Sequence, residues 1–385
     1  MIPYGRQDIS EEDISSVVDV LRSDFLTQGP KIPEFENCIK EYCGSQHAVA
    51  VNSATSALHI ACLALDLGTG DFLWTSPNSF VASANCAIYC GANVDFVDID
   101  ADTNNMCPIK LHEKLIQAKK VGRLPKIVIP VHLGGHSCDM EKIYTLGKEF
   151  GFSIIEDASH AIGATYKDRP VGCCQYSDIA IYSFHPVKII TTGEGGIALT
   201  NNPELDQKMR LLRSHGITRD PKQMLFIPDG PWYYEQISLG FNYRITDIQA
   251  ALGISQLKRV DSYIQKRRKI VEVYNKAFKN LPLILPSELS YCQSSWHLYI
   301  IRLKLDEIQK TLKEVHVELL NYEIGVNLHY IPIHTHPYYQ KRGFKKGDFP
   351  QSERFYSQAI SLPIHPTLKK EEQIKIIDAV KGIIQ

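Results

Sequence analysis

The sequence has no long basic segment, no apolar segment long enough to span a bilayer and no C-x-x-C cysteine pair. Lys and Arg total 42 against 43 Asp and Glu, and this balance argues against nucleic-acid or anionic-membrane partners. The ten cysteines are irregularly spaced, with only Cys173 and Cys174 adjacent, which argues against a disulfide framework and against zinc. The first residues, MIPYGRQDIS, carry charges and a proline where a signal peptide is apolar. We therefore expect a soluble, cytoplasmic protein.

Two nucleotide-binding signatures are also missing. The chain contains neither the G-x-x-x-x-G-K-[ST] loop of nucleoside-triphosphate sites nor the G-x-G-x-x-G loop of dinucleotide sites. The second absence argues against a Rossmann dehydrogenase, which would otherwise be an alternative for a chain with alternating strands and helices. We also find no internal repeat and no low-complexity segment.

The 385 residues, 44% of them apolar, are enough for one large and one small domain. From about residue 44, short β-branched segments alternate with amphipathic helices, which predicts a mostly parallel sheet covered on both faces. The seven predicted strands lie in segments 47–51, 72–76, 93–99, 126–135, 152–164, 178–184 and 195–201, and helices are predicted in 56–68, 80–91 and 138–151. A long helical stretch over 242–278 leads into a smaller strand-and-helix unit. We predict a large domain over 1–255 and a small C-terminal α/β domain over 256–385.

A single lysine, Lys188, lies in SFHPVKIITTGEGG (183–196), between a strand-like apolar segment and a glycine-rich turn. Glycines allow a bulky ligand to approach the backbone, and desolvation at a strand end lowers the pKa of an amine. A neutral amine is the nucleophile that forms a Schiff base with an aldehyde. Taken alone, a lysine at such a position is far more often an exposed loop lysine, so the assignment depends on its neighbours.

The best neighbour is Asp157, which ends the apolar segment FSIIEDA. Because Asp157 and Lys188 both follow predicted strands of a parallel sheet, both can reach the carboxyl edge where such sheets bind ligands. An acid at this place is often only a helix N-cap. Near a lysine, it fits a second role, which is to keep the ring nitrogen of a pyridine protonated. A lysine Schiff base with such an acidic partner is the arrangement used for pyridoxal phosphate.

The segment AVAVNSATSALHIAC (48–62) offers a place for a single phosphate, because a strand there meets a helix N-terminus. Its small residues with amides or hydroxyls are Ser53, Ala54, Thr55, Ser56 and Ala57. Helix capping explains one or two of them but hardly five in succession. Phe80, after the next predicted strand, could stack on a flat cofactor or belong to the core.

Five segments follow one another along nearly the whole chain: NSATSALHIACLAL, SPNSFVASAN, IIEDASHAIGA, DIAIYSFHPVKIITTGEGGIALTN and LGFNYRITDIQAALGISQL. Together they resemble the DegT/DnrJ-type sugar aminotransferases, which are fold-type I pyridoxal phosphate enzymes that act on nucleotide-linked keto sugars. Within the family, SFHPVK, IPYGRQDI and FLTQGPKIPEFE are most similar to the pseudaminic acid branch. That branch aminates a UDP-linked 4-keto-6-deoxy-N-acetylhexosamine. Two departures are Ala54, where glycine is frequent, and Ile189, where other residues are usual.

The resemblance implies a role for each matched residue. Lys188 corresponds to the lysine that carries the cofactor, and the alternative of a histidine there, found in dehydratase relatives, does not apply. Asp157 corresponds to the partner of the pyridine nitrogen, and Phe80 to the residue that stacks on the ring. The other implied cofactor residues are Thr55, Ser56 and Ser183 at the phosphate, His160 near the ring hydroxyl and Asn242. Asn242 resembles a residue that crosses from a second subunit, which implies a homodimer with shared sites.

The resemblance further implies a ping-pong transfer from an amino donor, which we expect to be glutamate, to the keto sugar. The residues expected to bind the nucleotide sugar are Tyr4, Thr27, Gln28, Lys31, His185, Arg244, His329, Tyr330 and His334. Alternatives are the same chemistry on a GDP- or dTDP-linked keto sugar, or a cofactor-binding regulator without turnover. The histidines at 329, 334 and 336 could also indicate a metal, but no cysteine or acid accompanies them at ligand spacing, so we expect none.

Overall fold

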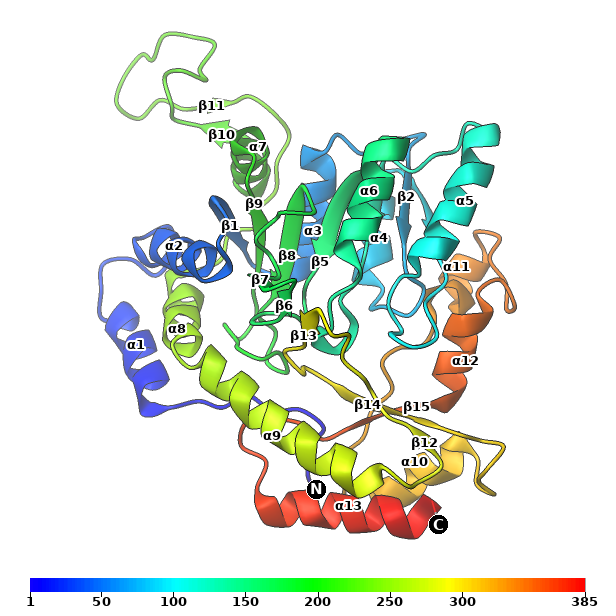
Figure 1. Ribbon diagram of the computed structural model, residues 1–385. Helices are drawn as coiled ribbons and strands as arrows, with labels where there is room; N and C mark the ends of the chain where they lie inside the picture. Colours follow the sequence, from blue (N-terminus) through cyan, green and yellow to red (C-terminus); the bar gives the residue numbers. More distant parts are fainter. Residues whose placement is uncertain (385) are drawn as a thin grey trace.

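The computed structural model describes residues 1–384, and its centre is a seven-stranded sheet with the order β1-β9-β8-β5-β4-β2-β3 (Figure 1). The strands are β1 (His47–Val51), β2 (Phe72–Thr75), β3 (Asn93–Phe96), β4 (Ile127–Ile129), β5 (Ser153–Asp157), β8 (Ile179–Ser183) and β9 (Gly196–Thr200). Neighbours are parallel except that β9 runs antiparallel to both β1 and β8. The predicted seven strands and the mostly parallel sheet are confirmed.

Helices cover both faces of this sheet (Figure 1). They are α2 (Lys31–Cys43), α3 (Ala54–Ala64), α4 (Ala82–Tyr89), α5 (Pro108–Lys120), α6 (Met140–Phe150), α7 (Pro203–Arg213) and α8 (Asp247–Leu257), while α1 (Glu11–Leu21) packs on α8. Successive side chains of a strand point to opposite faces, and β8 shows the result. Its Ile179 and Ile181 belong to the core that contains α3 and α4, whereas Ala180 and Tyr182 belong to the core that contains α2 and α8. The β-branched and apolar segments of the sequence are therefore buried on both sides.

A smaller unit packs on the three-stranded antiparallel sheet β12-β14-β15. Its elements are β12 (Leu283–Ile284), β14 (Tyr299–Leu303), β15 (Ala359–Leu362), α9 (Val260–Phe278), α10 (Leu312–Asn321) and α13 (Lys370–Ile384). Ile2 from the start of the chain joins this core. In the opposite direction, Ile333, Tyr339 and Phe349 pack into the core of the large sheet. The domain boundary near residue 255 stays a prediction.

The helical stretch expected over 242–278 is two helices rather than one. The α8 helix ends at Leu257 and α9 begins at Val260. Arg259, between them, bonds the carboxylate of Asp13 and the backbone carbonyl of Asp8. This anchor lets α8 pack beside α1 and α2, while α9 runs on into the small unit (Figure 1).

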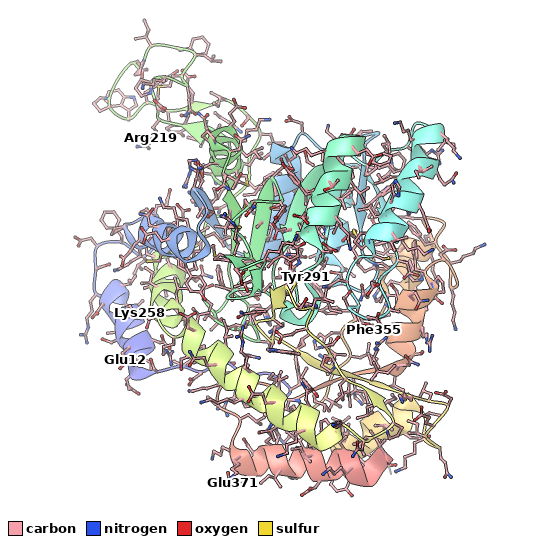
Figure 2. The ribbon with its side chains drawn as sticks, in the orientation of Figure 1. Glu12, Arg219, Lys258, Tyr291, Phe355 and Glu371 are labelled. Atoms are coloured by element: carbon pink, nitrogen blue, oxygen red, sulfur yellow. The ribbon has the colours of Figure 1, made fainter. Side chains whose placement is uncertain are left out.

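The remaining elements are short. They are η1 (Leu133–Gly135), η2 (Ile333–Thr335), α11 (Pro337–Gln340), α12 (Pro350–Gln358), β6 (Thr165–Tyr166), β7 (Arg169–Pro170), β10 (Ile217–Thr218), β11 (Glu235–Gln236) and β13 (Cys292–Gln293). The segment between β10 and β11 projects from the body of the chain, with Arg219 at its base (Figures 1 and 2). None of the helices within residues 1–384 combines the length and the apolarity needed to cross a membrane.

Candidate active site

Lys188 and Asp157 come from neighbouring parallel strands at the carboxyl edge of the sheet. Asp157 is the last residue of β5 and pairs with Ile181 of β8, and Lys188 lies five residues beyond the end of β8. After β8 the chain turns, and the backbone N–H of Lys188 donates to the carbonyl of His185 at 2.9 Å. The strands β6 and β7, which separate the two residues in sequence, do not enter the main sheet. The predicted meeting of the lysine and the acid at one edge follows from this topology.

The environment of Lys188 lowers the pKa of its amine. Its side chain is only partly exposed, and desolvation lowers its pKa to about 8, although the nearby Asp157 carboxylate opposes the shift. The exposed-loop alternative therefore does not hold. At neutral pH a useful fraction of the amine is unprotonated, which is the state that attacks an aldehyde.

This pKa makes the capture of an aldehyde cofactor depend on pH. The protonated fraction of the Lys188 amine rises as pH falls below about 8, so apoprotein at pH 7 should capture pyridoxal phosphate at about one-tenth of its plateau rate. The rate, followed by visible absorbance after mixing, should level off above pH 8. A rate that keeps rising beyond pH 10, as for an ordinary lysine, would contradict the assignment.

Asp157 is buried, and its carboxylate is held by two donors. The Ser83 hydroxyl donates to Oδ2 at 2.6 Å, and the Ser159 backbone N–H donates to Oδ1 at 3.2 Å. The residues after Asp157 form turns and not a helix, so the helix N-cap alternative is wrong. A buried carboxylate with its charge stabilised in this way is suited to face a cationic group.

A cradle for one phosphate lies at the N-terminus of α3. Ser53 caps this helix by accepting from the Ser56 N–H at 3.1 Å, which leaves the amides of Ala54 and Thr55 at the open end. Ser183 pairs with Gly196 across β8 and β9, and a side chain on Gly196 would collide with the backbone of Ser53 and Ala54. The geometry therefore brings Thr55, Ser56 and Ser183 together. The Ser56 hydroxyl is itself bonded to Asn52 Oδ1 at 2.6 Å.

Three rings surround the space between these groups. Phe80 is 59% exposed and does not belong to the core, and its ring centroid is 6.2 Å from that of Tyr330. Tyr330 stacks on His160 with centroids 6.1 Å apart and an interplanar angle of 20°. An exposed phenylalanine at this position leaves a flat apolar face available to a ligand.

The hydrogen bonds of His160 fix its tautomer. Nδ1 accepts from the Gly134 backbone N–H at 3.2 Å, so the proton lies on Nε2, which donates to the Tyr330 hydroxyl at 3.1 Å. Burial, with a further contribution from the Lys188 charge, holds the pKa of His160 well below its usual range. Burial together with the Asp157 charge raises the pKa of Tyr330. The Tyr330 hydroxyl therefore keeps its own proton free to donate to a ligand.

The expected substrate residues fall into two groups. Tyr4 and His329 lie next to Tyr330, with the rings of Tyr4 and His329 5.3 Å apart. Burial and the Lys188 charge lower the pKa of His329 to about 4, and its Nδ1 is 2.8 Å from the Ser361 hydroxyl. His185 is exposed just before Lys188. These residues surround the lysine.

The second group lies at the start of α2 and in the loop before it, and on the segment that precedes α8. Thr27 and Gln28 are exposed, and Lys31 pairs with Glu34 at 2.7 Å. This loop is tied to α8 because the Gly29 N–H donates to Asp247 at 2.8 Å. Arg244 and the exposed Asn242 lie on the segment that pairs with the end of β1.

His334 does not join the site. Its side chain is fully buried, and its Nε2 is 2.9 Å from the Glu353 carboxylate of α12, so its placement argues against contact with a substrate. No group of three His, Cys, Asp or Glu side chains in the described part of the chain is placed to hold a metal ion.

Sequence reasoning missed three contributors to the site. Ser83 lies within a helix that the sequence predicts, and nothing in its spacing marks it as part of the site. The sequence marks Gly196 only as the end of a glycine-rich segment at the start of a predicted strand, whereas in the structure it lets β9 pass against α3. His297, buried 4.4 Å from the His160 ring, carries no signal in the sequence.

The chain was compared with known proteins. Residues 7–381 match the DegT/DnrJ/EryC1/StrS aminotransferase family. The chain belongs to this family. It is 38% identical, over all of its length and 98% of the relative's, to a UDP-4-amino-4,6-dideoxy-N-acetyl-beta-L-altrosamine transaminase of Campylobacter jejuni.

Solved structures of the same family share the fold. Helicobacter pylori PseC, an aminotransferase involved in the biosynthesis of pseudoaminic acid, superposes with a TM-score of 0.90 at 33% identity, covering 100% of this chain and 99% of that one. The PLP form of the putative sugar aminotransferase Spr1654 from Streptococcus pneumoniae gives 0.88 at 32% identity, covering 99% and 98%. The family membership confirms the fold-type I architecture. It also rules out the alternative of a Rossmann dehydrogenase.

The cofactor of this sugar aminotransferase is pyridoxal phosphate. The residues present fit it: a lysine with a lowered pKa, a buried carboxylate, an exposed aromatic face and a helix N-terminus with open amides. When bound, the cofactor supplies an electron sink for a carbanion next to nitrogen. Lys188 would hold its aldehyde carbon, Asp157 its ring nitrogen, and Thr55, Ser56 and Ser183 its phosphate.

Proposed function

We propose that the chain transfers an amino group from glutamate to the keto carbon of a UDP-linked 4-keto-6-deoxy-N-acetylhexosamine, the reaction of the pseudaminic acid branch. The supporting observation is that a chain with Lys188 and Asp157 at one edge of the sheet is similar over its full length to transaminases named for a UDP-linked 4-amino-4,6-dideoxy sugar, which is the aminated form of such a ketone. The structural likeness to PseC supports the same substrate class.

The chain's own residues then divide the work. The Lys188 amine would hold the aldehyde carbon of the cofactor and, when free, would serve as the acid–base group at Nζ, because its pKa near 8 allows it both to accept and to return a proton. The Asp157 carboxylate, held by the Ser83 and Ser159 donors, would face the ring nitrogen. Phe80 and the cradle at the N-terminus of α3 would hold the cofactor ring in one orientation, which would favour cleavage of one substrate bond over its competitors.

The sugar-nucleotide would meet the aromatic cluster of Tyr4, His329 and Tyr330. These rings present one apolar face and one free donor, the Tyr330 hydroxyl, next to Lys188. Thr27, Gln28, Lys31 and Arg244 are proposed to reach the nucleotide of a site shared between subunits. His185, which is exposed near Lys188, is also proposed to bind the substrate.

A panel of nucleotide-linked keto sugars tests the substrate. The purified holoenzyme is incubated with glutamate and UDP-, GDP- or dTDP-linked ketones, and products are scored by mass spectrometry for replacement of the keto oxygen by an amino group. We expect the UDP-linked 4-keto-6-deoxy-N-acetylhexosamine to react fastest. If only GDP- or dTDP-linked ketones reacted, the assignment of the UDP-linked sugar would be wrong, while the proposed amino transfer would still hold. Bleaching of the visible band by glutamate would separate an enzyme from a non-catalytic regulator.

We propose that the enzyme is a homodimer with shared sites, and the projection between β10 and β11 supports this. Its exposed apolar side chains are Leu225, Phe226, Ile227 and Trp232, with Ile227 92% exposed. The Glu235 carboxylate accepts from the N–H groups of Leu225 and Phe226 at 2.6 and 2.8 Å, which stiffens the loop. A preorganised apolar projection is typical of a protein–protein contact. Asn242, exposed near α3, is proposed to reach the partner's phosphate.

Charging this projection should separate the subunits. The double variant Phe226→Asp, Ile227→Asp should run as a monomer by light scattering and lose most of its activity, because two carboxylates cannot be desolvated in an apolar contact. Val121, 68% exposed at the end of α5, provides the control Val121→Asp, which should stay dimeric. A monomeric wild type, or a double variant that stays dimeric, would contradict the proposal.

We also propose a cytoplasmic location. All ten cysteines are free in the described chain, as expected for a reducing compartment.

A further inference from the structure

A chain of buried hydroxyls leads to the carboxylate of Asp157. The Ser83 hydroxyl is 2.6 Å from Asp157 Oδ2, and the Ser79 hydroxyl is 2.9 Å from that of Ser83. The three residues are 2%, 1% and 5% exposed in the order Ser79, Ser83, Asp157. Buried polar groups of this kind interact strongly because the local dielectric is low.

The direction of these hydrogen bonds is fixed by the chemistry of the groups. An ionised carboxylate only accepts, so Ser83 must give its single proton to Asp157. The Ser83 oxygen then has only lone pairs left, and Ser79 must donate to it. Each bond polarises the next, which strengthens the donor that reaches the carboxylate.

The segment that carries the two serines is held at its start. The Pro77 carbonyl accepts from the Ile333 N–H at 2.7 Å, and the Asn78 side-chain amide donates to the Asn104 carbonyl at 2.8 Å. Ser83 lies in the first turn of α4, and Phe80 stands between the two serines. One short, anchored segment therefore sets both the aromatic face and the hydroxyl donors of Asp157.

We propose that Ser79 and Ser83 are positioning residues that hold the Asp157 carboxylate ionised and aimed at the ring nitrogen of pyridoxal phosphate. A hydrogen bond to the charged form favours that form. With the donor in place, the proton shared by the carboxylate and the pyridine stays on the pyridine, which keeps the electron sink. Without it, the proton moves toward Asp157 and the pair becomes neutral. The other titratable groups whose charge acts at Asp157 are Lys188 and Tyr330.

The test is a pH titration of the visible absorbance of the bound cofactor, recorded without substrate, together with the pH profile of kcat. In Ser83→Ala we expect the acid limb of both curves to move to higher pH by about one to two units, the size expected for a lost bond to a charged group. Ser79→Ala should move it in the same direction by less. Ser83→Cys, whose thiol is a weak donor, should fall between wild type and Ser83→Ala.

A matched control is Ser76→Ala, because the buried Ser76 hydroxyl has no hydrogen-bond partner within residues 1–384. It should leave the acid limb in place. A well-folded Ser83→Ala with an unchanged acid limb would overturn the proposal. If Ser83→Ala fails to fold or to hold the cofactor, Ser79→Ala is the test instead, because it keeps the Ser83–Asp157 contact. An acid limb that does not move in Ser79→Ala would then overturn the proposal.

The inference rests on the cofactor and not on the proposed sugar. The absorbance titration needs no substrate, so a wrong sugar assignment would appear only in the panel of ketones and would leave the spectral shift intact. A merely structural role of the serines would lower thermal stability or cofactor content without moving the acid limb.

Discussion

The Lys188→Ala variant should fold as the wild type does and lose turnover by about 10⁴-fold or more. We expect a loss at least as large as the greatest rate factor that a positioned acid–base group contributes, because this amine also carries the cofactor. The fold should survive, since Lys188 Nζ makes no hydrogen bond or ion pair with the described residues. Removing a desolvated amine should leave the melting temperature unchanged or slightly higher. Steady-state kinetics, absorbance and thermal unfolding measure the three effects.

The neighbours of Lys188 cannot replace it. Burial and the charge of Lys188 keep His160 and His329 neutral, and neither imidazole can form a Schiff base. A small primary amine added to Lys188→Ala should restore part of the proton transfer, because the space left by the side chain is next to the reacting carbon. Lys167→Ala is the matched control, since Lys167 is an exposed lysine paired with Glu141. Full activity in Lys188→Ala would remove the central residue from the mechanism.

The main sheet could be predicted from sequence because its strands are buried on both faces. Apolar segments such as those of β5 and β8 end where the chain leaves the core. The polar residue at that point must therefore lie at the edge of the sheet. Asp157 was predictable for this reason. Lys188 was predictable because the glycine-rich turn after β8 excludes a helix there.

Side-chain direction could not be predicted where the backbone is irregular. Residues 326–332 contain no regular strand, so nothing in the spacing distinguishes His329, which faces Lys188, from His334, which is buried against Glu353. Ser83 was equally hidden, because a serine in the first turn of a helix is ordinary in sequence. Its contact with Asp157 depends on how α4 packs over β5, which is a tertiary property.

The break between α8 and α9 has the same origin. No glycine or proline interrupts the helical pattern at Lys258 and Arg259. The chain turns there because Arg259 is held by Asp13, some 246 residues earlier in sequence. Local propensity cannot report an anchor of that kind.

Asp157→Asn should lower kcat by about 10²–10³-fold and weaken retention of the cofactor, the size expected when one partner of a buried charge pair is removed. The amide is isosteric, and its oxygen can still accept from Ser83 or Ser159, so the fold should hold and only the charge is lost. Without that charge, no carboxylate would stabilise a proton on the ring nitrogen, and the electron sink would weaken. Initial rates and cofactor stoichiometry by absorbance measure the effect.

Asp178 provides the matched control, because it stands just before β8 at the opposite edge of the same sheet. Its carboxylate accepts from the Ile154 N–H at 2.8 Å, and the amide of Asp178→Asn can do the same. Both substitutions remove one negative charge next to β8, but only one of them does so at the carboxyl edge, where Lys188 lies. If Asp178→Asn lost as much kcat as Asp157→Asn, net charge rather than position would explain the loss. Wild-type turnover in Asp157→Asn would show that the ring nitrogen needs no carboxylate, and the lysine alone would then have to account for catalysis.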